Sequence, residues 1–386
     1  MFLPSTGFTS DINCWIYWSS YIKTYGFRYT YNSGTNYNPF YQYILGFFAW
    51  INASPEKISA NIKYLKLITL IFDLIPIALL PHLFSIESKN RFFYPILLML
   101  SPVYLYNTLI WGQVDSIFTT FIFLSYFSIV KNKNVFSILF FMLAINMKTQ
   151  AIVFLPPLGL VYLLHSNLRF KNVFILILTT VLTQGILVLP FATTSGVISV
   201  WNIVAGSVDF YPWVSLNAFN FWHLVLDSNP IETNDGILFG GLSYKRWGLA
   251  LFFFASALIM TPLLLALIKK YRGIQQKDSK DLEILILGAI PVVFFYFNTQ
   301  MHERYSHPCL LFLAIYSFRK QNWTMLLLSQ ISYFLNMEAV MNYFGFNYSI
   351  WVFNTKTVAL IYSVLVIYIL YDIMNQMFKE IKVKGD

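Results

Sequence analysis

The sequence predicts an all-α polytopic membrane protein, with about 11 transmembrane helices and amphipathic helices at the external face. Of its 386 residues, 57% are hydrophobic and only 11% are charged, whereas soluble domains carry roughly a quarter charged residues. The apolar residues also gather in long runs separated by short polar stretches, as membrane helices require. We expect a single membrane domain over residues 1–386, because no long polar segment could fold separately.

The apolar runs predict where these helices lie. They cover residues 64–84, 92–109, 115–130, 135–148, 150–165, 172–191, 247–268, 283–299, 307–318, 323–336 and 357–377. Several are shorter than the roughly 20 residues that a membrane helix needs, so we expect the ends of these helices to differ by a few residues from the runs.

Lysine and arginine recur in short clusters after alternate apolar runs. Six clusters, at 89–91, 131–133, 169–171, 269–280, 319–320 and 379–384, hold 16 of the 26 basic residues. Loops rich in Lys and Arg stay in the cytoplasm, so the net charge of +9 reflects membrane topology rather than a nucleic-acid-binding patch. The segments 1–63, 110–115, 192–246, 300–306 and 337–356 then fall on the external face.

The first external segment, residues 1–63, has predicted structure of its own. Apolar residues from Ile12 to Ile22 recur at helical spacing, with Ser10 or Asp11 at the N-cap, and we expect this helix to lie in the membrane interface. Asn38-Pro39 begins a second interfacial helix, since proline suits the first helical position. Residues 1–10 match neither a signal peptide nor a membrane span. Residues 192–246 form the second large external loop.

Two acidic positions on the external face are candidates for chemistry. Asp11 stands beside an aromatic helix, where a partly desolvated carboxylate could act as a general base; as an N-cap it would need no further role. Trp111-Gly112-Gln113-Val114-Asp115-Ser116 lies where one span ends and the next begins. Asp115 would occupy the first turn of the next helix, where acids are favourable, or would face a substrate together with Gln113.

Two cationic positions share that face. Lys148, between two apolar spans, would need an anion, and a phosphate or a nearby carboxylate would serve. The polar segment 300–305 (Gln300-Met301-His302-Glu303-Arg304-Tyr305) interrupts two further apolar runs. It is either a short solvated loop or a functional cluster. In the second case Arg304 suits phosphate oxygens, and Glu303 and His302 orient it or titrate, although a purely structural Glu303–Arg304 pair would use the same residues.

No metal or cofactor site is expected. The two cysteines and five histidines have no metal-ligand spacing, and the glycines match no phosphate-binding loop. Aromatic and polar residues in 192–246 suit sugar binding as well as an interfacial belt. They are Trp201, Asp209, Trp213, Asn217, Trp222, His223 and Asp227. Asp73, inside an apolar run, is expected to pair with a neighbouring helix.

Taken in order, these motifs resemble a known superfamily. External Asp11, Asn38-Pro39-Phe40-Tyr41, Asp73 in a span, Trp111–Ser116, Lys148-Thr149-Gln150 before Pro156-Pro157, and His302–Tyr305 resemble the GT-C glycosyltransferases, which use polyprenyl-phosphate-linked sugars. The series, from about residue 9 to 310, is similar to the dolichol-linked-glycan α-1,3-glucosyltransferases and equally to prokaryotic and GPI-type mannosyltransferases. It departs from the eukaryotic glucosyltransferases at Trp111–Asp115 and at Arg304, which favours a prokaryotic relative. The superfamily has a first transmembrane helix before the external acid, and we expect this sequence to lack it.

The resemblance implies a metal-free inverting hexosyltransferase, with mannose or glucose as the sugar. Asp11 would be the catalytic base in an external catalytic loop. Arg304, Lys148 and His302 would bind the donor phosphate, and Gln113, Asp115, Glu303 and Trp111 would line the substrate pocket.

The implied partners are a polyprenyl-phosphate-linked sugar, an acceptor hydroxyl on a lipid-linked glycan or another molecule, and membrane lipid. The implied location is the plasma membrane of a prokaryote or the endoplasmic reticulum of a eukaryote. Two alternatives are a lipid-linked glycan polymerase or ligase, which usually has a long external loop with paired arginines, and a transporter, which should show internal repeats.

Overall fold

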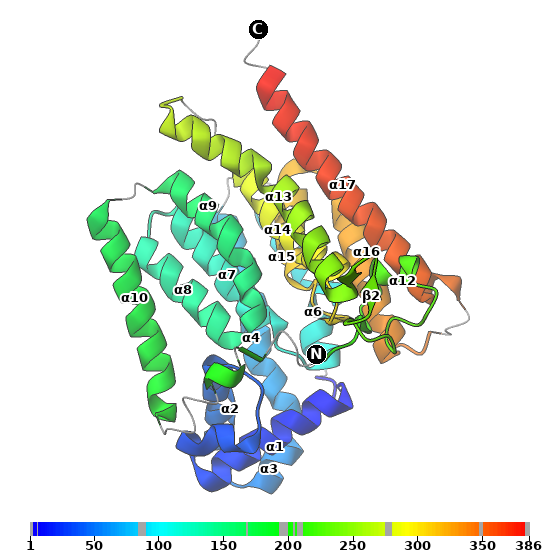
Figure 1. The fold of residues 1–386 in the computed structure, drawn as a ribbon. Helices are drawn as coiled ribbons and strands as arrows, with labels where there is room; N and C mark the ends of the chain where they lie inside the picture. The colour runs from blue at the N-terminus through cyan, green and yellow to red at the C-terminus, as the bar shows by residue number, and fades with distance from the viewer. Residues whose placement is uncertain are drawn as a thin grey trace. The chain divides into compact units, whose positions relative to one another are not determined.

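The computed structural model is 77% helical and all-α apart from a few two-residue strands. It describes residues 3–5, 7–83, 90–166, 169–192, 200–203, 205–206, 211–274, 280–346 and 350–382. The chain divides into two compact units (Figure 1). Unit 1 comprises residues 1–85, 105–152 and 165–210, and unit 2 comprises residues 86–104, 153–164 and 211–386.

Unit 1 begins with three helices that precede the first long apolar one. Its elements are α1 (Thr9–Tyr25), η1 (Phe27–Ser33), α2 (Pro39–Ile51), α3 (Pro55–Asn61), η2 (Ile62–Tyr64), α4 (Leu65–Leu83), η4 (Tyr106–Trp111), α7 (Asp115–Val130), α8 (Asn134–Met147), most of η5 (Thr149–Phe154), α10 (Phe170–Val188) and η6 (Leu189–Phe191). As expected, α2 begins with Pro39 after an extended Asn38. Ser54 caps α3, since its side chain accepts a hydrogen bond from the Lys57 backbone N–H.

The centre of unit 1 is α7. Ile117, Phe118 and Phe123 on different sides of this helix are fully buried, because α4 and α8 pack against it. Figure 1 shows α8 between α7 and α10. The outer face of α10 exposes apolar side chains such as Phe174 and Val181, which is the pattern of a helix that faces lipid.

Unit 2 is built around two buried helices. Its elements are α5 (Phe93–Met99), α6 (Pro102–Leu105), α9 (Leu155–His165), β1 (Ser215–Leu216), α12 (Trp222–Val225), β2 (Leu238–Phe239), β3 (Leu242–Ser243), α13 (Tyr244–Tyr271), α14 (Lys280–Phe297), β4 (Met301–His302), α15 (Pro308–Lys320), α16 (Trp323–Met341), η7 (Trp351–Phe353) and α17 (Thr355–Lys382). The helices α14 and α15 pack closely at Gly288, where a Cβ atom would lie 2.6 Å from Leu313 Cδ2. α13, α16 and α17 pack around them.

Each apolar run of the sequence coincides with helical structure, but the count of 11 spans is not confirmed. Among the described residues, four helices are long and apolar enough to cross a membrane: Pro55–His82, Phe170–Phe191, Tyr244–Tyr271 and Thr355–Met377. A bent pair, Phe93–Met99 with Pro102–Trp111, would make five. The chain therefore has the helices of a membrane protein, and the single membrane domain over 1–386 stays a prediction.

Candidate active site

Asp11 lies in the first turn of α1 and is held by an aromatic side chain from far along the chain. Its Oδ2 accepts a hydrogen bond from Trp111 Nε1 at 3.0 Å. The expectation that Ser10 or Asp11 caps this helix is wrong, because α1 begins at Thr9 and its N-cap is Phe8. Asp11 is half-buried, and among the described residues its second oxygen has no hydrogen-bond partner.

Trp111 is positioned by one contact to its ring and by two hydrogen bonds to the backbone at positions 111 and 112. It stacks on Phe8 with a ring-centroid distance of 4.7 Å, and its carbonyl accepts a hydrogen bond from the Phe8 backbone N–H at 2.8 Å. Trp15 Nε1 donates to the next carbonyl, that of Gly112, at 3.2 Å. Trp111 ends η4, a π-helical turn, a rare conformation that occurs frequently at functional sites. The carboxylate of Asp11 is therefore oriented by a rigid partner.

Gly112 makes the turn that follows. Its φ of +85° is in the left-handed region, and a Cβ atom there would lie 2.9 Å from Ile12 Cδ1. A side chain at position 112 would therefore strain the backbone and push against α1. This glycine allows the Trp111–Ser116 motif to lie directly on the helix that carries Asp11.

Gln113 and Asp115 continue the same network. Gln113 Oε1 accepts a hydrogen bond from Tyr37 Oη at 3.2 Å, while its Nε2 is buried without a partner among the described residues. Asp115 begins α7 as expected, and its Oδ2 accepts from Asn107 Nδ2 at 3.1 Å. Its Oδ1 forms an ion pair with Lys148. The anion that Lys148 needed is thus a carboxylate in this structure.

A further contact joins the start of α2 to the lysine motif. Asn38 Nδ2 donates to the Ile145 carbonyl at 2.7 Å and to Thr149 Oγ1 at 3.1 Å. The Asp11, Asn38-Pro39, Trp111–Ser116 and Lys148-Thr149 motifs therefore meet in unit 1. Five of the eight predicted site residues belong to this cluster: Asp11, Trp111, Gln113, Asp115 and Lys148.

Two other charged residues inside α4 lie near this cluster. Asp73 is fully buried near the hydroxyl groups of Thr108 and Ser116, and its expected pairing to a neighbouring helix stays a prediction. Sequence reasoning missed Lys66, which is 4% exposed. Its Nζ donates to the Leu109 carbonyl in η4 at 2.7 Å and to the Pro4 carbonyl at 3.2 Å. A lysine within an apolar run was the signal that could have found it.

The other three predicted residues belong to unit 2, in the polar segment 300–305. This segment is not a solvated loop: Met301, Glu303 and Arg304 are 6%, 2% and 6% exposed. It contains β4, which pairs in parallel with β1 so that Ser215 lies opposite Met301 and Leu216 opposite His302. This pairing joins the segment to residues that precede it by more than 80 positions.

Glu303 is the central charge of this segment. Arg304 Nη1 donates to Glu303 Oε1 at 2.5 Å, and His302 Nδ1 lies 3.8 Å from Glu303 Oε2. Burial raises the pKa of the Glu303 carboxyl, but the Arg304 charge and the contact with His302 outweigh it and hold the pKa below its usual value. Glu303 thus holds Arg304 in place. This arrangement is expected both if Glu303 orients a phosphate-binding arginine and if the pair is purely structural. His302 is half-exposed and lies between the rings of Tyr211 and Tyr305.

Asp235 is a second residue that sequence reasoning missed. It is 3% exposed, and its Oδ2 accepts hydrogen bonds from Thr299 Oγ1 and Gln300 Nε2, both at 2.8 Å. These contacts hold the start of the polar segment, where Gln300 adopts a left-handed φ of +61°. Asp235 stands alone in a polar loop, so the sequence gave no signal for it.

The candidate sugar-binding residues of 192–246 are divided between the two units. Trp201 belongs to unit 1 and is 70% exposed, and Asp209 lies outside the described residues. Trp222 and His223 are buried in unit 2, and Trp222 Nε1 donates to the Phe297 carbonyl at 3.0 Å. Asn217 has a left-handed backbone conformation, with a φ of +66°, and forms a β-bridge with His302. These contacts give Trp222 and Asn217 structural roles.

Within the described part of the chain, no three His, Cys, Asp or Glu side chains gather as a metal site would require. The cluster in unit 1 offers a half-buried carboxylate, a buried amide and an ion pair. That set can take a proton from a hydroxyl group and hold polar groups of a ligand.

Comparison with known proteins places these observations in a class. Residues 45–213 match the model of a family described as ALG3 protein, a dolichol-linked mannosyltransferase family of the GT-C type. The match covers less than half of the chain, and it includes the Trp111–Ser116 and Lys148 motifs. It supports a GT-C glycosyltransferase, and with the apolar helices it points to a membrane protein. No curated protein matches the chain.

Proposed function

We propose that the protein is an inverting GT-C glycosyltransferase that moves a hexose from a polyprenyl-phosphate donor to a hydroxyl group of a lipid-linked glycan or another acceptor. The family match favours mannose over glucose as the sugar. The transfer takes place at the external or luminal face, in the plasma membrane of a prokaryote or the endoplasmic reticulum of a eukaryote.

The observation that carries this proposal is the hydrogen bond from Trp111 Nε1 to Asp11 Oδ2. It joins two motifs that are 100 residues apart in the sequence, both of which the resemblance assigns to the site. A purely structural acid at the start of a helix would instead bond to the backbone N–H groups of its own first turn. Among the described residues the Asp11 side chain makes no such bond, and its hydrogen bond is the one from Trp111.

In the proposed reaction, the acceptor hydroxyl oxygen attacks the anomeric carbon of the sugar. The bond between that carbon and the phosphate oxygen breaks, and the electron pair leaves with the polyprenyl phosphate. Asp11 takes the hydroxyl proton through its second oxygen, since a positioned carboxylate can act as a general base. Trp111 orients this carboxylate, and Gln113, whose Nε2 is buried without a partner among the described residues, donates to a sugar or acceptor hydroxyl.

The departing phosphate needs positive charge, which side chains can supply without a metal. Lys148 is the cation of the cluster in unit 1, where Asp115 holds it. The resemblance also assigns Arg304 and His302, in unit 2, to the binding of a donor phosphate, with Glu303 as the group that fixes Arg304. Lys148 and Arg304 are therefore each held beside a carboxylate until an anionic ligand competes for them.

The test is a transfer assay on the purified chain with polyprenyl-phosphate mannose and polyprenyl-phosphate glucose offered in parallel. Asp11→Asn should abolish transfer while expression and thermal stability stay unchanged. Glu56→Gln, which alters an exposed acid in α3 of the same unit, should keep full activity. Full activity of Asp11→Asn would refute the assignment of the base, and no transfer from either donor by the unaltered chain would refute the function.

Two further arms test the phosphate site. Activity should survive EDTA, and a strict requirement for Mg²⁺ or Mn²⁺ would contradict a metal-free mechanism. Arg304→Ala should raise the KM for the carrier-linked donor, and unchanged donor kinetics would remove Arg304 from the phosphate site.

A further inference from the structure

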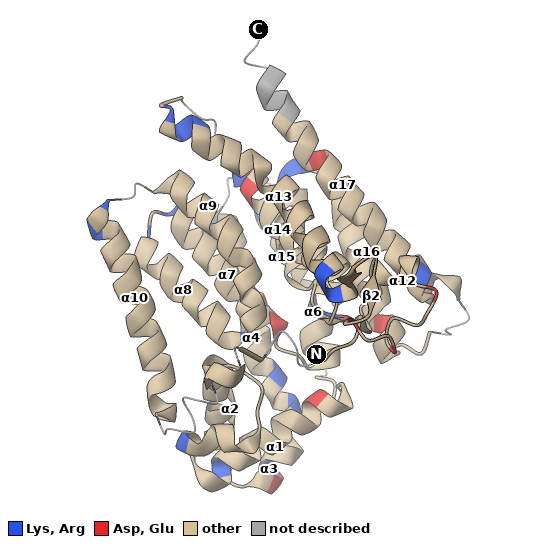
Figure 2. Cartoon of the chain, viewed as in Figure 1, with Lys and Arg blue, Asp and Glu red and all other residues tan. Residues whose placement is uncertain are grey.

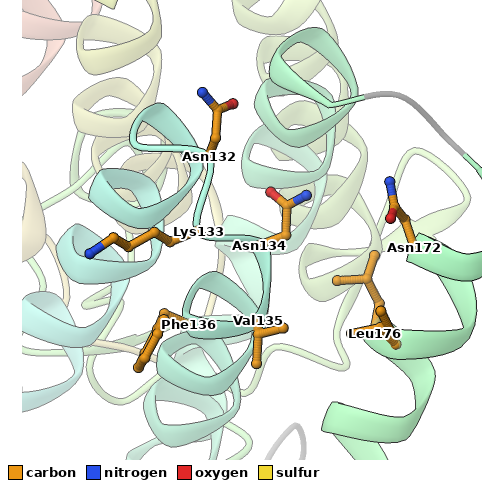
Figure 3. A pocket seen from close by; sticks show the side chains of 8 residues that line it. Asn132, Lys133, Asn134, Val135, Phe136, Asn172 and Leu176 are labelled. Carbon is orange, nitrogen blue, oxygen red and sulfur yellow. The ribbon is translucent and has the colours of Figure 1, made fainter.

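A pocket of ≈ 380 Å³ lies in unit 1 between the turn before α8 and the first turns of α10. Three asparagines, Asn132, Asn134 and Asn172, and the apolar side chains of Val135, Phe136 and Leu176 line it. Figure 3 shows the asparagine amides on one side of the pocket and the apolar side chains on the other. The pocket is therefore amphipathic.

The apolar wall belongs to helices with lipid-facing character. Val135 and Phe136 are 45% and 52% exposed, and α10 continues below Leu176 with exposed Ile177 and Val181. A wall of this kind suits a hydrocarbon chain, which would cover apolar surface that is otherwise open.

The mouth of the pocket is strongly basic. Lys131, Lys133, Arg169 and Lys171 flank the asparagines and are all exposed, and the sequence contains no Asp or Glu between Asp115 and Asp209. Two helices also begin here, α8 at Asn134 and α10 at Phe170, and neither has a side-chain cap. The N-terminal ends of the two helices add partial positive charge. The Lys133 side chain points away from Asn172 in this structure (Figure 3), and its flexible four-carbon stem is long enough to turn toward a ligand.

The pocket is remote from the candidate active site. The 19 residues of α10 span about 28 Å, and the other end of this helix contacts α2, where Tyr43 Oη donates to the Leu187 carbonyl at 3.0 Å. Figure 2 shows basic residues at the N-terminal end of α10, away from the end of unit 1 that holds α1, α2 and α3. The length of α10 is close to the thickness of the hydrocarbon layer, roughly 30 Å.

We propose that this pocket binds a glycerophospholipid with an anionic headgroup, from the leaflet opposite the site of transfer. An acyl chain lies along Val135, Phe136 and Leu176, and the phosphate and headgroup meet the asparagine amides and the four cations. A soluble anion would leave the apolar wall uncovered, and a choline headgroup would bring a quaternary ammonium beside four like charges.

The test measures the thermal unfolding midpoint of the purified full chain in detergent as lipid is added. Phosphatidylglycerol should raise the midpoint, whereas phosphatidylcholine and inorganic phosphate should have little effect. The double variant Lys133→Gln/Arg169→Gln should need roughly 30-fold more phosphatidylglycerol for half the effect, since each basic residue near an anionic headgroup changes binding about fivefold. Leu176→Trp should reduce the effect by filling the pocket.

The matched control is Arg28→Gln/Lys57→Gln, which removes one exposed arginine and one exposed lysine of the same unit, in η1 and α3. It should keep the response to phosphatidylglycerol. The proposal is wrong if phosphatidylcholine stabilises equally, if inorganic phosphate alone reproduces the effect, or if the control variant loses as much response as the pocket variant. If Leu176→Trp does not fold, the comparison of the pocket double variant with the control double variant still tests the proposal.

Discussion

At the scale of single residues, the pair of Trp111 and Asp11 has the clearest consequence for chemistry. The Trp111 ring contributes its stacking on Phe8 and its N–H group, which donates to Asp11. Trp111→Phe keeps an aromatic ring and removes only the donor. We expect kcat to fall about tenfold, because a lost hydrogen bond to a charged group is worth roughly 1.5 kcal/mol or more, while the donor KM changes little.

The contrast with Trp111→Leu separates orientation from packing. The leucine variant loses both the donor and the stacked ring, so its thermal stability should fall as well as its activity. Steady-state transfer kinetics and unfolding midpoints of the two variants, measured together, check this. Unchanged kcat in Trp111→Phe would mean that the indole only packs.

His223 gives a prediction about pH. It is 4% exposed, and both ring nitrogens are buried without hydrogen-bond partners among the described residues. Burial lowers the pKa of His223 to about 4. The unfolded chain, with a pKa near 6.5, takes up a proton that the folded chain refuses, so stability falls as the pH drops from about 6.5 to about 4, by up to about 3 kcal/mol.

His223→Phe should reduce this loss of folding stability at acid pH, because a neutral ring of similar size does not titrate. The measurement is the unfolding midpoint at pH 7, 5.5 and 4.5. An equally steep profile in His223→Phe would show that other groups dominate the acid loss.

At the scale of elements, the turn after η4 is the most constrained connection in unit 1. Gly112→Ala should reduce activity and lower stability by at least about 1 kcal/mol, since alanine at a φ of +85° is strained and its Cβ would press on Ile12. Gly159→Ala is the control, because a Cβ atom there meets nothing within 4 Å. Unfolding midpoints and transfer rates of both variants check this, and equal behaviour would contradict it.

The elements also show which features a sequence can predict. The start of α2 at Pro39 and of α7 at Asp115 followed from local signals, because a proline or an acid in the first turn acts through its own backbone. The π-helical η4 and the pairing of β4 with β1 did not, since both depend on contacts with distant residues. Tertiary contacts override local preference in such segments.

The candidate site also combines features that the sequence can predict with contacts that only the fold determines. The resemblance implied that Asp11, Asp115, Lys148 and Trp111 belong to one site. Their pairing required the fold: Asp11 meets Trp111 instead of capping its helix, and Lys148 meets Asp115. Asp235 was missed because its partners are polar groups far away in the sequence, which no spacing rule can reveal. Lys66 was overlooked although a lysine within an apolar run is itself a signal; its partner, the Leu109 carbonyl, could come only from the fold.

At the scale of the whole molecule, the distribution of charge predicts how the chain lies in the membrane. In unit 1, α10 links two different ends: the basic mouth of the pocket at its N-terminal end, and the contact with α2 at its C-terminal end (Figure 2). Basic loops stay in the cytoplasm, so the end with α1, α2 and α3 should be external.

Cysteine labelling tests this orientation. Cys309 is buried, so a Cys14→Ser background leaves no other accessible thiol, and Lys57→Cys and Lys133→Cys each add one at an exposed position. A membrane-impermeant maleimide applied to intact cells that carry the chain in their plasma membrane should label position 57. Position 133 should react only after the membrane is permeabilised. Labelling of both from the same side would refute the orientation, and with it the assignment of the basic pocket and Asp11 to opposite leaflets.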